Sequence, residues 1–457
     1  MAPRGVVRHS SFMSKLDPSA RVSRAVRAVV VLSVVARNLG VVGVRFLLRR
    51  PTPAGEVAHR LRLTFGRLGG VYVKFGQLLG SAPSIFGPEM ASEFRDMLDQ
   101  GEPVRVSDVV ATLEREWRRP LHEVVARIDP HPIGCASLAV VHRATLRTGE
   151  DVAIKVLRPG IEAHVSVDIG LLQPLAAIVA RRFGVGEAEP AVRLLDGLSR
   201  QLSEELDLLR EADAIAAART ALDDQPHGRL SVPRVFRAWS TRRALVIEYV
   251  EGVAIDDAQG LAARGIDSVA LTTDLLQWWF ECALSGPFHA DLHAGNLLVT
   301  GDGSLYVIDW GITAQLDEVS GAFLRRLIEA ALGDDSGWDD ALPPLLATWD
   351  APPGMTQDEL AAMVRGLLTS VLTMPFGNVE LGGLIVVPER RPDERRWRRE
   401  SVKEWVAGDG TEFERHVTLL LKQLLYFERY GKLYIPELSL LQDREYFVRL
   451  LAATANG

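Results

Sequence analysis

The residues best suited to chemistry lie in the segment His289-Ala290-Asp291-Leu292-His293-Ala294-Gly295-Asn296, which is followed by Asp309-Trp310-Gly311. An Asp with an Asn five positions later, and a second Asp after a short hairpin, is the spacing of a phosphotransfer centre. Such a centre holds Mg²⁺ through carboxylate and amide oxygens while another carboxylate orients the attacking oxygen. We therefore predict that Asn296 and Asp309 bind the metal and that Asp291 orients the acceptor.

A lysine on an apolar segment completes this polar set. Val152-Ala153-Ile154-Lys155 is typical of a strand, and a kinase lysine at this point holds the α- and β-phosphates of the nucleotide. Because a lysine among apolar neighbours needs a partner, we expect an ion pair with Glu211, which lies in a later helical stretch. We assign Ala153 to the nucleotide pocket. Glu248 and Val250, in the place of the hinge, are expected to meet adenine through their backbone groups.

These residues need a scaffold, and the pattern of the chain predicts two lobes. Short β-rich runs surround a helical stretch, an order that suits the small lobe of a kinase. The expected strands span residues 137–146, 151–157, 235–239 and 244–249, and the expected helix spans residues 191–221. Helices dominate further on, with strand-like runs at 296–299 and 305–308 on either side of a Gly-Asp-Gly turn.

Ahead of the small lobe, apolar residues recur in steps of three and four from Leu61 to Leu79, which predicts a helix with one apolar face. Another helix is expected to begin at Gly87-Pro88. We therefore predict an α+β protein with a protein-kinase-like two-lobed fold and an N-terminal helical extension. Its expected parts are an N-terminal segment (1–54), the helical extension (55–118), a kinase-like N-lobe (119–251) and a helical kinase-like C-lobe (252–457).

Composition excludes several other classes of protein. With 47% hydrophobic and 24% charged residues, the 457-residue chain resembles an ordinary globular protein of more than one domain. A net charge of −7 argues against a nucleic-acid binder. The two cysteines, Cys135 and Cys282, lie far apart and lack metal-ligand spacing, so neither a disulfide nor a zinc site is expected. A reducing, cytoplasmic location fits this pattern.

The N-terminal segment is apolar but interrupted. No secretory signal peptide is evident. The run from Ala28 to Leu48 contains Arg37, Asn38 and Arg45, so we do not expect it to span a bilayer. Its basic flanks leave two interpretations, a helix packed on the protein itself and an interfacial helix that is peripheral at a membrane surface.

No Gly-rich G-x-G-x-x-G loop precedes Lys155, and Pro132-Ile133-Gly134-Cys135-Ala136-Ser137 takes its place. This segment resembles the Ala-rich loop that the UbiB (AarF) family of atypical protein-kinase-like proteins uses over the nucleotide. The resemblance implies that Gly134, Cys135, Ala136 and Ser137 bind the nucleotide. Gly134 and Cys135 stand where the family has alanines, which leaves the preference between ATP and ADP open.

Two further motifs resemble that family and not kinases in general. Lys74-Phe75-Gly76-Gln77 matches its K-x-G-Q motif on the helical extension. Glu205-Leu206-Asp207 matches its E-x-D motif, although Ala214 stands where the family has Asn. The resemblance implies that the K-x-G-Q segment folds over the cleft, in the space where a protein substrate would lie. It also implies that the segment, with Lys74 and Gln77 as its site residues, is joined there by the carboxylates of Glu205 and Asp207, which would pair with Lys74.

The combined pattern predicts an atypical kinase or ATPase that binds ATP or ADP with Mg²⁺. It would hydrolyse ATP or transfer phosphate to a small or lipid-like acceptor. No A-P-E sequence follows Gly311, so protein phosphorylation is not expected. The family resemblance implies support of isoprenoid-quinone metabolism, with a lipid or quinone precursor as ligand. The sequence leaves the acceptor and the oligomeric state open.

Three other interpretations remain at this point. The aminoglycoside phosphotransferases, which are small-molecule kinases, also have a His-x-Asp-x-x-x-x-Asn loop, although the Lys74 to Gln77 motif argues against that group. A nucleotide-binding scaffold with little turnover would need the same pocket. A metal hydrolase could use His289, Asp291 and His293 as alternating ligands, but it would leave Lys155 and its partners without a role.

Overall fold

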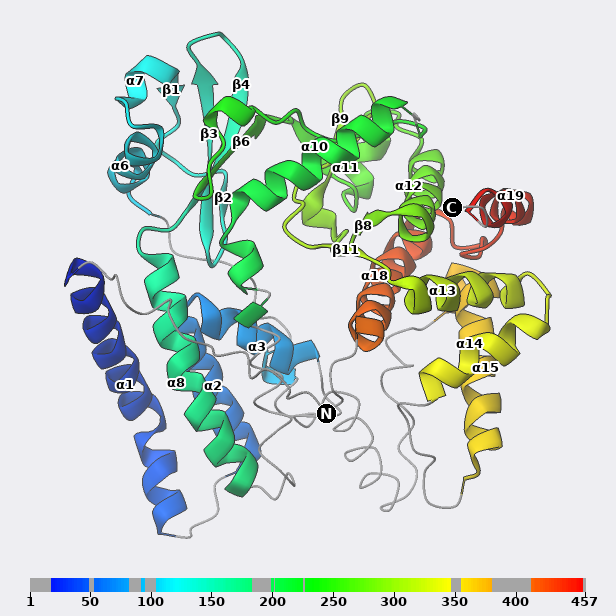
Figure 1. The fold of residues 1–457 in the computed structure, drawn as a ribbon, viewed down its shortest axis with the longest axis horizontal. Coiled ribbons are helices and arrows are strands. Elements are labelled where there is room, and N and C mark those ends of the chain that lie inside the picture. The colour runs from blue at the N-terminus through cyan, green and yellow to red at the C-terminus, as the bar shows by residue number, and fades with distance from the viewer. Residues whose placement is uncertain are drawn as a thin grey trace, which may run out of the picture.

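The computed structural model of the protein describes residues 18–48, 53–81, 92–94, 104–182, 199–200, 202–224, 227–346, 355–379 and 412–454. An antiparallel sheet and a largely helical lobe lie side by side, and the N-terminal helices form a separate group below the sheet (Figure 1). The architecture is α+β, a protein-kinase-like fold of two lobes with an N-terminal helical extension, as the sequence predicts. The domain boundaries expected after residues 54, 118 and 251 stay predictions.

The sheet of the first lobe has the strand order β1-β3-β4-β6, and β2 pairs with the far end of β3. Its antiparallel strands are β1 (Val125–Ile128), β2 (Gly134–Cys135), β3 (Ala139–Leu146), β4 (Asp151–Leu157) and β6 (Ala244–Glu248). Strands β3 and β4 form the expected hairpin. Gly149 in its turn has a φ of 100°, a conformation that favours glycine.

Strand β4 has two different faces because successive side chains of a strand point to opposite sides. Three aliphatic side chains pack toward the helix α6 (Val106–Trp117), and these are Val152, Ile154 and Val156. Ala153 and Leu157 join the main core on the other face. Lys155 shares this second face, so the alternation directs its ammonium group away from α6. The short helix α7 (Leu121–Val124) follows α6 beside the same sheet.

The strand predicted at residues 235–239 is not formed. Val235 makes a single bridge to Ile247, and Arg237–Trp239 closes into the 3₁₀ helix η1. This turn places the Trp239 carbonyl 2.9 Å from the indole nitrogen of Trp117, and the two rings meet edge to face. Packing against α6 therefore decides the conformation that strand propensity alone predicted wrongly.

Two long helices follow β4 in the chain. Helix α8 (Ile161–Arg182) begins directly after the strand and was not among the expected elements. The helix predicted at 191–221 is interrupted at Leu206 and Asp207. Residues 199–200 and 202–205 are helical before this break, and α10 (Leu208–Asp224) follows it. Residues 191–198 lie outside the described part of the chain.

The N-terminal extension consists of α1 (Pro18–Leu47), α2 (Ala54–Leu68) and α3 (Val71–Ser81), grouped with α8 (Figure 1). The single helix predicted from Leu61 to Leu79 is broken at Gly69 and Gly70, whose φ angles are 64° and 52°. Glycine tolerates these values, so the chain turns there and the K-x-G-Q segment lies on α3. The start of the helix expected at Gly87-Pro88 lies outside the described residues.

Arg27, which is largely buried, ties helix α1 to two of its neighbours. Arg27 donates to both carboxylate oxygens of Asp168 in α8, at 2.9 and 2.7 Å. The same guanidinium donates to the Leu68 carbonyl at the end of α2, at 2.8 Å. The Asp168 side chain is almost fully buried, so Arg27 provides its charge balance as well as its hydrogen bonds.

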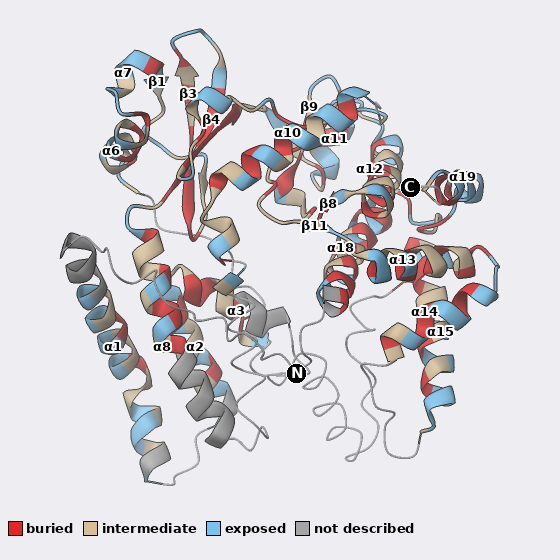
Figure 2. Cartoon of the chain, viewed as in Figure 1, coloured by how far each residue is buried: buried red, intermediate tan, exposed pale blue. Residues whose placement is uncertain are grey.

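The outer face of α1 is exposed (Figure 2). Its exposed side chains include Arg37 and six aliphatic residues, Val26, Val29, Val30, Leu32, Val41 and Val44. Asn38 and Arg45, which interrupt the apolar run in the sequence, turn toward α2, where they contact Arg67 and Glu56. By length and composition, Ala25–Arg45 is sufficient to span a membrane, and only 6% of that window is buried. Two of the residues that argued against a membrane helix therefore lie on its protein-facing side.

The second lobe holds the catalytic segment on short strands. A four-stranded sheet has the order β5-β10-β9-β7, and β8 pairs with β11. These strands are β5 (Leu230–Ser231), β7 (Gly252–Ala254), β8 (Pro287–His289), β9 (Leu297–Thr300), β10 (Leu305–Val307) and β11 (Thr313–Gln315). The two runs predicted beyond the catalytic loop correspond to β9 and β10, within one residue at each end.

Helices surround these strands. They are α11 (Ala258–Ala263), α12 (Ser268–Ser285), α13 (Glu318–Ala331), α14 (Ser336–Leu346), α15 (Gln357–Thr373), α18 (Glu412–Tyr434) and α19 (Arg444–Thr454). Trp279 of α12 packs edge to face on the rings of Phe288 in β8 and Phe427 in α18, with ring centres 5.5 and 5.2 Å apart. Its indole nitrogen donates to the His289 carbonyl at 2.9 Å. This aromatic contact fixes the strand that leads into the catalytic loop against both helices.

Candidate nucleotide-binding and catalytic site

Lys155 lies at the centre of a cluster of three charged side chains. Its Nζ is 2.9 Å from both carboxylate oxygens of Glu211, which lies in the first turn of α10. It is also 3.0 Å from Oδ2 of Asp309, which follows β10 in the second lobe. The ion pair that we expected between Lys155 and Glu211 is present. The cluster joins the sheet, α10 and the second lobe at one point.

One ammonium group balances two carboxylates here. Burial raises the pKa of Glu211 to about 7, although Lys155 opposes that shift. Burial would also raise the pKa of Asp309, but Lys155 outweighs it and holds that pKa below its ordinary value. Burial acts to lower the pKa of Lys155, and the two carboxylates raise it above its ordinary value. Glu211 is 5% exposed and the Asp309 side chain 43%, so the deeper carboxylate takes a proton first.

His289 connects the loops that carry Asp291 and Asp309. Its Nδ1 accepts a hydrogen bond from the Asp291 backbone N–H at 3.1 Å, so its Nε2 carries the proton and donates to the Asp309 carbonyl. Burial lowers the pKa of this ring, which favours the neutral form that the two bonds require. Trp310 packs edge to face on the imidazole, with ring centres 5.0 Å apart. The imidazole of His289 therefore links the backbone of Asp291 to the backbone of Asp309.

Asn296 and Asp309 offer oxygen ligands that suit Mg²⁺. The side-chain nitrogen of Asn296, in η2 (Ala294–Asn296), donates to the Asp291 carbonyl at 2.9 Å, which leaves its oxygen as the ligand atom. Asp309 Oδ1 accepts from the Gly311 N–H at 3.0 Å, and the side chain keeps a substantial exposed area. Carboxylate and amide oxygens are the donors that a hard cation prefers. The residues present therefore fit a magnesium–nucleotide complex.

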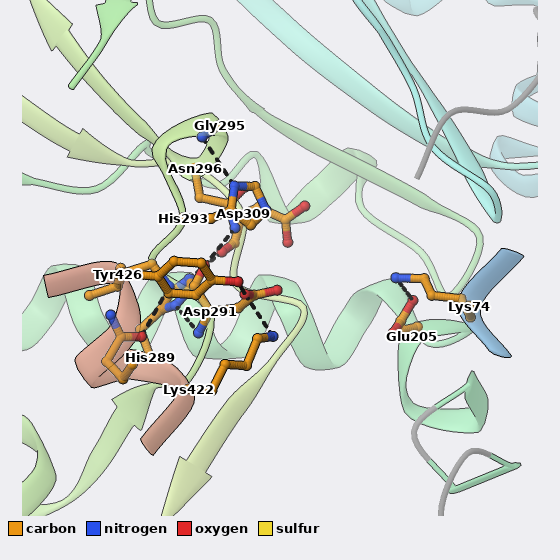
Figure 3. Close-up of polar contacts among 12 residues, drawn as sticks. Lys74, Glu205, His289, Asp291, His293, Gly295, Asn296, Asp309, Lys422 and Tyr426 are labelled. Carbon is orange, nitrogen blue, oxygen red and sulfur yellow. Dashed lines mark hydrogen bonds and ion pairs between the residues drawn. The ribbon is translucent and has the colours of Figure 1, made fainter. Parts of the chain in front are cut away.

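The metal-hydrolase interpretation is not supported by this geometry. Both ring nitrogens of His289 are engaged by backbone groups. His293 Nδ1 accepts from the Gly295 N–H at 3.0 Å (Figure 3). Within the described residues, no group of three or more His, Cys, Asp or Glu side chains is placed to hold a metal ion. The histidines shape the loop instead.

Comparison with known proteins shows the family of the chain. Residues 96–337, more than half of the chain, match the family model of the ABC1 atypical kinase-like domain. The chain belongs to this ABC1 family. An uncharacterized protein of Mycobacterium tuberculosis is 33% identical over 405 residues, which are 88% of this chain and 80% of that protein.

Two further relatives carry family names. An uncharacterized aarF domain-containing protein kinase of the chloroplast from Arabidopsis thaliana is 30% identical over 394 residues, 84% of this chain and 73% of that protein. The probable protein kinase UbiB of Marinobacter nauticus is 27% identical over 413 residues, 87% of this chain and 70% of that protein. The resemblance to the UbiB (AarF) family is therefore confirmed.

The loop from Gly134 to Ser137 is closed by hydrogen bonds to its backbone. Gly134 and Cys135 form β2, and the Ala136 N–H donates to the Ala139 carbonyl at 2.9 Å. Arg158 donates to the Ala136 carbonyl at 2.9 Å, and Ser137 is buried. A Cβ at Gly134 would meet the Val141 side chain at 3.6 Å, an ordinary contact. An alanine would therefore fit at position 134 without a steric clash.

The K-x-G-Q motif on α3 and the E-x-D motif ahead of α10 are only partly brought together. Lys74 on α3 pairs with Glu205 at 3.3 Å, to one side of the group around Asp291 (Figure 3). Asp207 instead lies 3.2 Å from Arg242, and its other oxygen accepts from a backbone N–H in the first turn of α10. A carboxylate just ahead of a helix satisfies the unpaired amides there, which is why Asp207 caps α10 and does not join Lys74. The side chain of Gln77 lies outside the described residues.

The predicted hinge residues Glu248 and Val250 lie at the end of β6 and just after it, and their contact with adenine stays a prediction. The Glu248 N–H donates to the Arg234 carbonyl at 2.9 Å, and its side chain accepts from the Arg234 N–H at 3.1 Å. Both of these groups are therefore occupied, which leaves the Glu248 carbonyl for a ligand. Val250 follows directly after the strand, and Ala153 lies in β4 beside Lys155.

Sequence reasoning missed two residues that reach the catalytic loop from far along the chain. Lys422 Nζ lies 2.8 Å from Oδ1 of Asp291, and the Tyr426 hydroxyl donates to the same oxygen at 3.0 Å (Figure 3). Both belong to α18, four positions apart and hence on one face of the helix. That spacing is visible in the sequence, but nothing in the sequence connects it to Asp291.

Proposed function

We propose that this protein binds a magnesium–nucleotide complex between its lobes and either hydrolyses ATP or transfers its terminal phosphate to a small or lipid-like acceptor. The proposal rests on Lys155, which is held between Glu211 and Asp309 from different lobes. A kinase-type site requires this arrangement, because the lysine must stay in place for the phosphates. Asp291 and Asn296 on the adjoining loop supply the remaining groups.

Each residue then has one task. Lys155 would hold the α- and β-phosphates, and Asn296 and Asp309 would hold Mg²⁺, whose charge offsets that of the phosphates. Asp291 would orient the acceptor hydroxyl or water and take up its proton. The closed loop at Gly134 to Ser137 and the carbonyl of Glu248 would surround the base and sugar. ATP and ADP both fit this description.

We also propose that the acceptor is lipid-like and that the protein works at a membrane surface in support of quinone metabolism. Two observations support this extension. Relatives of the chain carry the name UbiB, and the outer face of α1 exposes a row of aliphatic side chains. Because the inner face of α1 is bound to α2 and α8, contact with lipid would involve one side of the helix.

Two other functions share the same pocket. A small-molecule kinase of the aminoglycoside-phosphotransferase type would phosphorylate a water-soluble acceptor and ignore membranes. A nucleotide-binding scaffold would bind the nucleotide and turn over very slowly.

The test is Mg²⁺-dependent ATP hydrolysis by the wild type and by Asp309→Asn, with and without anionic liposomes or a quinone-precursor mimic. We expect the substitution to lower the rate by about 10²–10³-fold, the usual loss for one preorganised polar group. Asp302→Asn is the matched control, because Asp302 is an exposed carboxylate that only stabilises the β9–β10 turn. A folded wild type that binds no nucleotide would overturn the proposal, and binding without turnover would favour the scaffold.

A further inference from the structure

The contact between α18 and Asp291 is the feature that the proposed function leaves unused. The carboxylate of Asp291 has to work beside the phosphates of a nucleotide, where like charges repel each other. The catalytic segment from Asp291 to Asn296 contains no lysine or arginine. Lys155, the cation described above, is already shared by two carboxylates. A further positive charge at this point would offset the repulsion.

Lys422 brings such a charge to the catalytic loop. Its Nζ is 2.8 Å from Asp291 Oδ1, and its side chain is 38% exposed, so the ammonium group is not enclosed by the protein. An ammonium group has three N–H donors, and the carboxylate oxygen takes one. Lys422 can therefore stay on Asp291 and donate to a bound anion at the same time.

The helix that carries Lys422 is held tightly under the loop. Gln423 accepts from the Leu292 N–H at 3.1 Å, and the Tyr430 hydroxyl donates to the Leu292 carbonyl at 2.7 Å. Phe427, between them, is fully buried against Trp279. A side chain on a helix anchored in this way is positioned far better than one on a free surface.

The two contacts from α18 also make the two oxygens of the Asp291 carboxylate different from each other. Lys422 and Tyr426 both bind Oδ1, so Oδ2 is the oxygen left to face an acceptor. One oxygen is held in place while the other can receive a proton.

We propose that Lys422 is a catalytic residue, whose ammonium group contacts the phosphoryl group during its transfer while it anchors Asp291 through Oδ1. The inference rests on the proposed function and names a further residue of the same site. In the step, the bond from the terminal phosphorus to the bridging oxygen of ATP breaks, and a bond to the acceptor oxygen forms. The acceptor proton moves to Asp291 Oδ2, and ADP leaves with the bond electrons. Lys422 neutralises charge throughout and exchanges no proton.

The first readout is binding and needs no turnover. Wild type and Lys422→Met are titrated with Mg-ADP alone and with Mg-ADP plus aluminium fluoride, a mimic of the phosphoryl group in transfer. We expect equal affinity for Mg-ADP and a loss of about tenfold or more for the aluminium fluoride complex, the equivalent of one charge-assisted hydrogen bond. Lys422→Arg should restore most of the loss because it keeps the charge.

Lys432→Met is the matched control. Lys432 lies on the same helix with the same 38% exposure, but it pairs with Glu428 at 2.6 Å and does not reach Asp291. The second readout is kinetic, and we expect Lys422→Met to lower kcat while KM for ATP stays within about twofold, as for a group that acts in the transition state. If Lys422→Met does not fold, Lys422→Gln takes its place.

The outcomes separate the two proposals. A wild type that binds neither complex contradicts the proposed function itself. A wild type that binds both, with Lys422→Met binding the aluminium fluoride complex equally well, contradicts the role of Lys422 alone. An equal loss in Lys432→Met would also overturn it, because the effect would then come from the general charge of α18.

Discussion

At the scale of single residues, the lysine cluster combines one positive charge with two negative charges in a partly buried space. Glu211 is nearly inaccessible, whereas Asp309 keeps an open side. Burial therefore raises the pKa of Glu211 to about 7, and the negative charge of Asp309 adds to this shift. The pKa of Glu211 therefore depends on the negative charge of Asp309, which stays ionised because its own pKa is lowered.

The first prediction follows from that coupling. A cation bound to Asp309 removes its repulsion on Glu211, so the pKa of Glu211 should fall and the protein should release a proton when Mg-nucleotide binds. Release should be largest near pH 7 and should disappear well above it, where Glu211 is already ionised. The measurement is calorimetric titration with a non-hydrolysable Mg-nucleotide in two buffers of different ionisation enthalpy.

Glu211→Gln is the control for this prediction, because glutamine keeps the shape and cannot release a proton. Proton release by the nucleotide itself remains in that variant and can be subtracted. Equal release in the variant and the wild type would show that Glu211 does not hold the proton.

The raised pKa of Glu211 also affects the stability of the fold. A carboxyl group whose folded pKa is raised stabilises the fold most below its unfolded pKa of 4.5, and this contribution is lost as pH rises toward 7.

At the scale of elements, the best buried ion pair of α1 is the one between Arg27 and Asp168. Arg27 joins Asp168 of α8 and the end of α2, and the Asp168 side chain is only 1% exposed. Burial raises the pKa of Asp168, and Arg27 opposes that shift. Without its partner, Asp168 would be a buried and uncompensated charge.

We therefore predict that Arg27→Met weakens the docking of α1 by about 3–5 kcal/mol, the usual loss when one member of a buried pair is removed. Hydrogen exchange of the α1 amides measures the effect. The matched substitution Arg45→Met, on the same helix, removes an exposed pair with Glu56 and should change little. The loss in Arg27→Met should shrink as pH falls, because a protonated Asp168 needs no partner. Equal effects of the two substitutions would contradict this explanation.

At the scale of the whole molecule, α1 exposes several aliphatic side chains on one helix. The helix lies at the outer edge of the N-terminal group, away from the second lobe (Figure 1). Its inner face is bound to α2 and α8, and its outer face is exposed to solvent. A membrane surface would cover that face without displacing α1 from α2 and α8.

We predict that Val29→Glu with Leu32→Glu lowers the fraction of protein that sediments with anionic liposomes. Each side chain removed from lipid should reduce affinity by about tenfold, since its burial is worth about 1.5–3 kcal/mol. Val319→Glu on α13 is the control, because Val319 is similarly exposed but lies on the second lobe. Unchanged sedimentation of the double variant would exclude the outer face of α1 as the lipid contact.

The sequence by itself determined the local parts of this protein. The spacing of Asp291, Asn296 and Asp309 and the apolar strand around Lys155 predicted the phosphotransfer loop and the two-lobed fold, because loops and strands of this kind have short-range signatures. The pairing of Lys155 with Glu211 also followed from the order of the elements, since it repeats a known arrangement of strand and helix.

Only the tertiary structure decided which residues far apart in the chain form ion pairs and hydrogen bonds with one another. Asp207 caps α10 and contacts Arg242, although its motif suggested Lys74 as a partner. Lys422 and Tyr426 reach Asp291 because α18 packs under the catalytic loop, a contact that helical periodicity does not encode. Asn38 and Arg45 interrupt an apolar run in the sequence, yet the packing of α1 turns them toward the protein. In each case the partner is determined by packing between elements that are far apart in the chain. Sequence spacing predicts only which residues are neighbours within one element.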